Sequence, residues 1–387
     1  MTQRENTDWR LVWLIWAAGL GMAAQYGKIS VIFGRLPEVY PSAGAALGFA
    51  VSLVGFVGIL LGVAAGLLVA RVGFRRALLA GLIGGGALSM LQALWPPLPV
   101  FLGLRLLEGA THLAMVVAAP TLIAEVTAPR DQGRALTLWG SFFGVAFAVL
   151  VWGGLPLAQA HGLGALMAAH GLYMWLMAGL LWFVLPTVVQ APRGVSVAEL
   201  ARAHGQIYRS PSIGAPAAGW LFYTFCFVST LTLVPPYLAP EWRALTIGAM
   251  PLLSIVSSLT LGAWALRRLS AVSVVVAGFL ASAGCVMALL VWPGAPWAAM
   301  GLGASLGLVQ GASFAAVPQL NARTEDRALA NGGLAQMGNL GNTIGTPVVL
   351  GVIAVAGYAG FMSAVLAMLL CGAGAHMVLA RLRSPRR

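Results

Sequence analysis

Charged residues are scarce in this chain of 387 residues: Asp, Glu, Lys and Arg together make up 8% of it. Soluble domains carry roughly 25% charged residues, whereas 60% of this sequence is hydrophobic. The hydrophobic surface of such a chain is too continuous to be hidden in one aqueous core. The composition therefore excludes an ordinary soluble protein, and a lipid bilayer is the solvent that fits.

Cysteine is also rare. Cys226, Cys285 and Cys371 lie far apart within hydrophobic runs and form no Cys-x-x-Cys pair, so we expect no metal site and no redox site. The sequence contains no Walker motif and no nucleophile–base set. We therefore expect a protein that is not an enzyme and that needs no cofactor. The first hydrophobic run lacks a small-residue cleavage site, and we expect it to remain as a membrane helix.

Acidic residues are outnumbered, with 10 Asp and Glu against 22 Lys and Arg, which gives a net charge of +12. A basic face can bind nucleic acid. Here, however, the positive charge is spread over separate segments without interleaved aromatic residues. We expect no nucleic-acid partner, and we interpret the charge as orientation in the membrane and attraction to anionic headgroups.

The cations themselves follow a pattern. Eighteen of the 22 lie in the tails or in every second gap between hydrophobic runs: Arg4, Arg10, Arg71, Arg75, Arg76, Arg130, Arg134, Arg193, Arg202, Arg209, Arg267, Arg268, Arg323, Arg327, Arg381, Arg383, Arg386 and Arg387. Short loops rich in Lys and Arg stay cytoplasmic. The alternation predicts a multi-pass protein of the bacterial inner membrane with both termini in the cytoplasm. Arg35 and Arg243 then fall in periplasmic loops, and Lys28 (the only lysine) and Arg105 fall inside hydrophobic segments.

A helix needs about 20 apolar residues to cross the hydrocarbon core. On that basis the sequence predicts twelve membrane helices: 11–33, 45–69, 77–95, 98–125, 135–158, 165–189, 213–239, 245–266, 271–292, 297–321, 328–356 and 359–380. The polar stretch 190–212 divides them into six plus six, and Val197 to Tyr208 within it could form a short amphipathic helix at the membrane surface. The predicted domains are a bundle over 1–189, a cytoplasmic linker over 190–212 and a bundle over 213–387.

The two halves share short sequence matches at corresponding places. Gly66–Arg71 after the second span matches Gly262–Arg267 after the eighth, and Ala119–Ala124 matches Val317–Ala322 at the ends of spans four and ten. Such duplication is how many secondary transporters are built. We therefore expect an all-α membrane protein with two pseudo-symmetric six-helix bundles.

These features together resemble the major facilitator superfamily over essentially the whole chain. The resemblance rests on two motifs. The first is a signature loop between spans two and three, formed by Gly66, Arg71, Gly73, Arg75 and Arg76. The second is the sequence Arg105-Leu-Leu-Glu-Gly109 early in span four. The resemblance implies that the loop latches the two halves together during gating. The acidic residue usual before the loop arginine is Ala70 here, and Phe74 replaces a usual cation, so the latch would depend on Arg71 or be weaker.

Within the superfamily, Gln25-Tyr26-Gly27-Lys28 and the stretch 105–120 are similar to a branch with bacterial riboflavin and copper importers. Copper members use Met and His pairs in spans seven and eight, where this chain has only Met250 and no histidine. His170 and Met174 have the spacing but lie in span six, which disfavours copper. Span five lacks the Gly-Pro pattern typical of proton-coupled drug antiporters, its nearest approach being Gly153-Gly154-Leu-Pro156.

Ionisable side chains at membrane depth are costly unless paired or hydrated, so each is a functional hypothesis. Arg105, Glu108 and His112 share one face of span four, and Gln25 and Lys28 share one face of span one. Counting about 1.5 Å per residue places them at similar depths, which predicts a Lys28–Glu108 or an Arg105–Glu108 contact. These residues and Tyr26 are the candidate substrate and coupling site. A fixed structural ion pair, and a simple interior role for His112, remain the alternatives.

The second half carries no comparable intramembrane charge. Its candidates are neutral: Tyr223 and Thr224 in span seven, Gln310 in span ten, and Asn339 and Asn342 in the glycine-rich span eleven. Buried amides need hydrogen-bond partners, whereas the glycines of span eleven are expected to allow close helix packing.

The function that this pattern favours is secondary active transport of a small polar or anionic organic solute by alternating access. Protons are the expected coupling ion, because Glu108 and His112 are available. We expect a monomer in the lipid bilayer. Efflux of hydrophobic or cationic compounds is one alternative, although two cations in the cavity would repel such substrates. A non-transporting membrane receptor or scaffold is the other.

Overall fold

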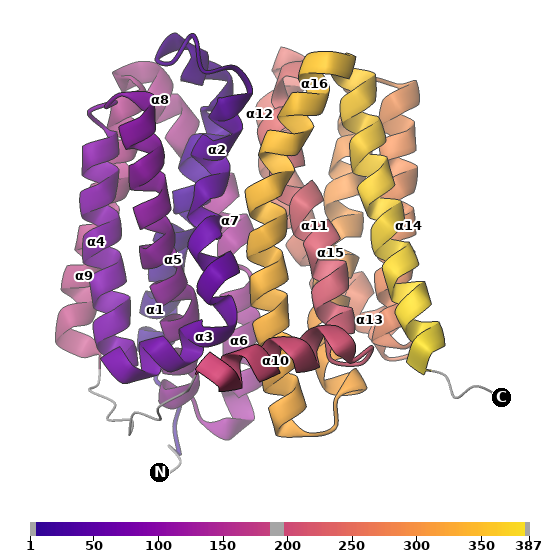
Figure 1. Ribbon diagram of the computed structural model, residues 1–387. Coiled ribbons are helices and arrows are strands. Elements are labelled where there is room, and N and C mark those ends of the chain that lie inside the picture. Colours follow the sequence, from indigo (N-terminus) through magenta and orange to yellow (C-terminus); the bar gives the residue numbers. More distant parts are fainter. Residues whose placement is uncertain (1–4, 186–196, 384–387) are drawn as a thin grey trace. The chain divides into compact units, whose positions relative to one another are not determined.

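A computed structural model describes residues 5–185 and 197–383, and every element within those ranges is a helix (Figure 1). In the first half the helices are α1 (Trp9–Val31), η1 (Phe33–Glu38), η2 (Gly44–Ala46), α2 (Leu47–Ser52), η3 (Leu53–Gly55), α3 (Phe56–Val72), α4 (Phe74–Gln92), α5 (Leu98–Val126), η4 (Pro129–Asp131), α6 (Gln132–Gly140), α7 (Phe142–Val149), η5 (Leu150–Gly154), α8 (Leu155–His161) and α9 (Leu163–Val184). The remainder are α10 (Val197–Arg209), α11 (Gly214–Leu233), η6 (Pro235–Tyr237), α12 (Pro240–Ser257), η7 (Ser258–Gly262), α13 (Ala263–Leu266), α14 (Ala271–Val291), α15 (Pro296–Leu320) and α16 (Thr324–Arg383).

Ten helical stretches in the described ranges are long and apolar enough to cross a membrane. One of them, in α16, joins two helices across a break at Gly357, which has φ 60° and ψ −153°. The 23-residue helix α1 is long enough to cross a membrane but is not among the ten. The prediction of an all-α membrane protein is thus confirmed, and the count of twelve membrane helices stays a prediction.

Proline and glycine explain where several helices end. The sequence predicts a seventh span reaching residue 239, but α11 ends at Leu233 because Pro235 and Pro236 cannot continue the hydrogen-bond ladder. Gly73 separates α3 from α4 with φ 93°, a conformation that a side chain rarely adopts. A signature-loop glycine is therefore required there by the backbone itself.

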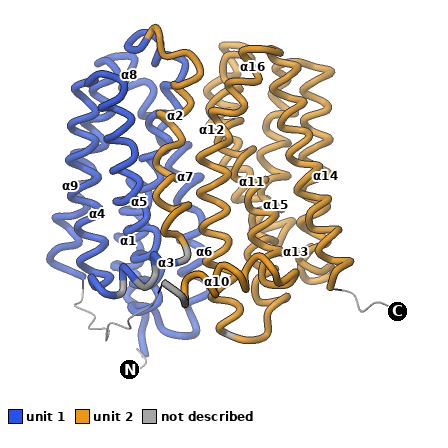
Figure 2. Tube along the Cα trace, viewed as in Figure 1, with its two compact units in different colours: residues 1–40, 64–195 blue, residues 41–63, 196–387 orange. Residues whose placement is uncertain are grey.

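The chain forms two compact units (Figure 2). Unit 1 contains residues 1–40 and 64–195. Within it α1 packs against α5, α7 and α9, and α4 packs against α5 and α9. Its apolar core includes the fully buried Ile15 and Met22 of α1, Leu82 of α4 and Leu122 of α5. This arrangement leaves the polar residues of α1, α4, α5 and α9 facing one another.

Unit 2 contains residues 41–63 and 196–387. Its largest contact is between α11 and α16, and α2 also packs on α16. Glycine makes the first contact possible, because a Cβ added at Gly345 would lie 2.6 Å from the backbone oxygen of Phe225. The division into bundles over 1–189 and 213–387 stays a prediction.

The amphipathic helix predicted within the linker is confirmed as α10. In unit 2 the Tyr208 hydroxyl of α10 donates to Gln336 Oε1 at 2.6 Å, and Gln336 Nε2 donates to the Ile59 carbonyl at 2.7 Å. Linker residues 190–196 lie outside the described residues. Gln336 thus joins α10 to both α16 and α3.

Candidate functional site

Glu108 is the centre of a buried polar cluster in unit 1. Its Oε1 accepts from Lys28 Nζ at 2.7 Å, and its Oε2 accepts from Gln92 Nε2 at 2.8 Å and from Arg105 Nη1. The side chains of Lys28, Arg105 and Glu108 are all fully buried. Both predicted contacts of Glu108 are therefore made, and one carboxylate serves two cations.

Helix geometry explains why these groups meet. Arg105 and Glu108 are three residues apart on α5, so they lie on the same helix face. The Arg105 guanidinium also reaches α1, where Nη2 donates to the Gln25 carbonyl at 2.7 Å. Arg105 thereby connects Glu108 with the backbone of the helix that carries Lys28.

The ammonium group of Lys28 has three polar neighbours. Besides Glu108, it donates to Ser89 Oγ at 2.8 Å and lies 3.3 Å from His170 Nδ1. His170 Nε2 lies 2.8 Å from the Gly21 carbonyl and must donate to it, because a carbonyl only accepts. Ser89 Oγ donates to the Met167 carbonyl at 2.7 Å. His170 Nδ1 also lies 2.9 Å from Ser89 Oγ, so the imidazole ring links Lys28 and Ser89 to the backbone of α1.

His112 has a different partner from the one its spacing suggests. Its Nδ1 lies 3.1 Å from Gln25 Oε1, to which it donates, and its ring is packed edge-on against Tyr26 at 5.2 Å. The Gln25 amide donates in turn to Thr111 Oγ1 at 2.9 Å. His112 is thus joined to Glu108 through Gln25 and Thr111, whose hydroxyl donates to the Glu108 backbone oxygen at 2.7 Å.

Three members of the cluster were not among the residues predicted for the site: Ser89, Gln92 and His170. Gln92 and His170 are polar side chains inside predicted spans three and six, and this is the signal that could have identified them. The spacing of His170 from Met174 instead resembles a copper-binding pair, and the position of these residues in span six disfavours copper. Within the described residues no group of three or more His, Cys, Asp or Glu could hold a metal ion.

The charges of the cluster do not cancel. With Lys28 and Arg105 protonated and Glu108 ionised, three fully buried side chains carry one net positive charge. Uncompensated charge in a dry interior is costly. The cluster can reach neutrality if Lys28 releases a proton or if an anion binds. Because the Lys28 ammonium already has three neighbours, an entering anion must replace at least one of them.

The candidates in the second half form no comparable cluster among the described residues. Tyr223 is stacked between Trp220 and Phe227, with ring centroids 4.5 and 5.4 Å away. Thr224 donates to carbonyls of its own helix, and Gln310 accepts from Ser254 at 3.3 Å.

The two amides of span eleven differ. Asn339 donates to the Ala335 carbonyl of its own helix at 2.8 Å and packs against Gly58. The buried Oδ1 of Asn342 has no hydrogen-bond partner among the residues that the structure describes. A buried amide oxygen of this kind is available to a donor, which keeps Asn342 as a candidate.

The signature loop lies at the junction of α3 and α4. Arg71 and Arg76 are exposed, and Gly66 lies within α3. Arg75 instead donates from Nε to the Leu185 carbonyl at 3.0 Å and from Nη2 to the Trp182 carbonyl at 2.6 Å. The loop arginines thus differ in their surroundings, and Arg75 binds the end of α9.

Arg35 and Arg243 are separate from the cluster. Arg35 forms a two-pronged ion pair with Glu38 at 3.0 Å, which lowers the pKa of that carboxyl below its ordinary value. Arg243 donates to the Leu238 carbonyl at 3.1 Å. Neither contributes charge to the site.

Comparison with known proteins identifies the class of this protein. The family model of the Major Facilitator Superfamily matches residues 11–324, and the chain therefore belongs to this superfamily of secondary transporters. The fold is similar to the crystal structure of the major facilitator superfamily transporter FucP in the outward conformation. That match has a TM-score of 0.67 and 15% sequence identity, and covers 97% of this chain and 99% of that one. A search of curated protein sequences finds no match.

Proposed function

We propose that this protein carries a small anionic organic solute across the bacterial inner membrane together with a proton, by alternating access. The observation that supports the proposal is the buried excess of positive charge around Glu108. An anion bound beside Lys28 would neutralise that excess and keep Lys28 protonated. Release of the anion would favour release of the proton, because the empty site is neutral only when one cation is lost.

The proton has a defined place in this scheme. Lys28 Nζ is held between the Glu108 carboxylate and Nδ1 of His170, 2.7 and 3.3 Å away. The carboxylate and an unprotonated Nδ1 are both acceptors, so either can receive a proton from the ammonium group. Arg105 stays charged and keeps Glu108 in position through their contact. Lys28 is thus the proposed coupling residue, and Glu108 and His170 are its proton partners.

The excess positive charge of the cluster also favours one class of substrate over others. Two buried cations repel a cationic compound, which disfavours efflux of hydrophobic cations. A neutral solute would leave the excess charge uncompensated. An anion is the class that the cluster would bind best.

A ligand screen tests the proposal. Purified protein is heated in the presence of anionic, neutral and cationic metabolites, because a ligand that binds the folded state raises the unfolding temperature. We expect stabilisation by one or more carboxylates or phosphates, and loss of that stabilisation in Lys28→Met. Stabilisation by cations alone, or an unchanged shift in Lys28→Met, would refute the anion site.

A further inference from the structure

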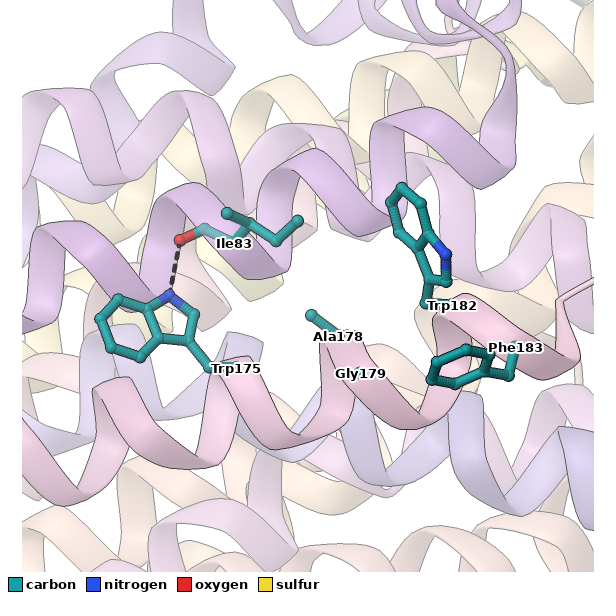
Figure 3. Close-up of a pocket in the computed structure, with 6 residues that line it drawn as sticks. All are labelled: Ile83, Trp175, Ala178, Gly179, Trp182 and Phe183. Carbon is teal, nitrogen blue, oxygen red and sulfur yellow. Dashed lines mark hydrogen bonds between the residues drawn. The ribbon is translucent and has the colours of Figure 1, made fainter.

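A groove on unit 1 lies between α4 and α9, and none of the residues of the charged cluster line it (Figure 3). It is lined by Ile83, Trp175, Ala178, Gly179, Trp182 and Phe183. The lining is apolar, and five of these six residues are exposed at the surface. The exposed fraction of Phe183, at 86%, is large for an aromatic side chain. On a membrane protein such a surface faces lipid.

Close packing of the two helices fixes one end of the groove. At Gly86 of α4 and Gly171 of α9 the two backbones are so close that an added Cβ would lie about 3 Å from the partner's carbonyl oxygen. The Trp175 indole then closes the groove by donating to the Ile83 carbonyl at 3.0 Å. Beyond that bond the wall consists of Ala178 and Gly179, and a Cβ at Gly179 would meet nothing within 4 Å.

Two arginines of α4 lie near the end of the groove that Trp182 lines. Arg75 lies over the Trp182 ring at 5.4 Å and donates to the carbonyls of Trp182 and Leu185. Arg76 is exposed and lies seven residues before Ile83, which places both on the same face of α4, about 10 Å apart. Among the described residues neither arginine has a carboxylate within 4.0 Å.

We propose that this groove is a binding site for an anionic phospholipid. An acyl chain would lie along Trp175, Gly179 and Trp182, and the phosphate would meet Arg76 and the side of Arg75. Basic residues beside a groove between membrane helices are the chemistry that binds such headgroups. The positive-inside rule places this end of the bundle at the cytoplasmic surface, so the lipid belongs to the inner leaflet.

The test is native mass spectrometry of the purified full chain with phosphatidylglycerol or phosphatidylcholine of identical acyl chains. We expect preferential retention of phosphatidylglycerol. Arg76→Gln should weaken it about fivefold, the value of one surface arginine at an anionic headgroup. Gly179→Leu should reduce retention further, because the new side chain takes up room in the groove while its Cβ meets no described atom within 4 Å.

Matched controls separate this site from the general lipid shell. Gly284 of α14 is also exposed with nothing within 4 Å of an added Cβ, and Arg268 lies over the Trp264 ring at 4.7 Å. Gly284→Leu and Arg268→Gln should retain phosphatidylglycerol as the parent protein does. Equal retention of the two lipids, unchanged retention in Gly179→Leu, or an equal loss in the controls would overturn the proposal.

Discussion

At the scale of single residues, the decisive feature is one carboxylate shared by two cations. The contacts of Glu108 with Lys28 and Arg105 could be predicted from helix spacing and depth, because both depend on the regular rise of α1 and α5. The proximity of His170 to Lys28 could not be predicted from the sequence, because it depends on how α9 packs against α1. Likewise, His112 contacts Gln25 on a neighbouring helix, which spacing along α5 does not reveal.

Removing the charge of Glu108 should separate coupling from binding. We expect Glu108→Gln to abolish gradient-driven uptake in proteoliposomes while solute exchange continues, because the amide cannot take part in proton transfer. Uptake and exchange of a solute found in the thermal screen are measured side by side. Undiminished accumulation by the variant would remove Glu108 from the coupling step.

The same cluster predicts a stability pattern. At a pH at which Lys28 is protonated, Glu108→Gln leaves Lys28 and Arg105 buried without a counter-charge, and breaking a buried pair in this way costs about 3–5 kcal/mol. Lys28→Met together with Glu108→Gln leaves one unpaired cation instead of two and should recover part of that loss. Thermal unfolding of the two single variants and the double variant measures the coupling energy. Additive losses would show that the two side chains do not interact.

At the scale of elements, proline and glycine set the limits of several helices. The break at Gly357 between the predicted spans 328–356 and 359–380 is visible in the sequence. The end of α11 at Leu233 follows from Pro235 in the sequence, although the predicted span extends to residue 239. The π-helical turn at Leu150–Gly154 in the fifth passage was not predicted, because such a turn depends on local hydrogen bonding rather than on composition.

Close packing of α11 on α16 leads to a prediction for this pair of helices. Gly345→Leu should destabilise the protein by about 1–3 kcal/mol, the usual cost of overpacking, because the new side chain meets the Phe225 backbone. Gly351→Leu on the same helix is the control, since a Cβ there meets nothing within 4 Å. Thermal unfolding of both variants measures the difference, and equal stability would contradict the packing argument.

At the scale of the whole molecule, the distribution of arginine predicts orientation. Ser42, between the first two passages, should face the periplasm, and Leu269, before α14, should face the cytoplasm. Both are exposed, so each can be replaced by Cys in a background without the three native cysteines. A membrane-impermeant thiol reagent on intact cells should label Ser42→Cys and spare Leu269→Cys. The reverse result would invert the topology.

The fold class could be predicted from the sequence. Scarce charge and long apolar runs are what a lipid bilayer requires, and duplicated motifs indicate two related bundles. The transported solute could not be predicted from the sequence, because its recognition depends on a few side chains brought together from α1, α4, α5 and α9. The proposed coupling of an anion to a proton depends on those side chains. It can be tested without a transport assay.

The direct test is the number of protons exchanged when solute binds. Purified protein in a weakly buffered solution is mixed with the anion that stabilises it most, at a pH at which the free anion carries no exchangeable proton and the empty protein has released the proton of Lys28. We expect uptake of about one proton per bound anion, since the bound anion favours the charged form of Lys28. Lys28→Met should bind no proton. Anion binding without proton uptake, or unchanged uptake in Lys28→Met, would contradict the account.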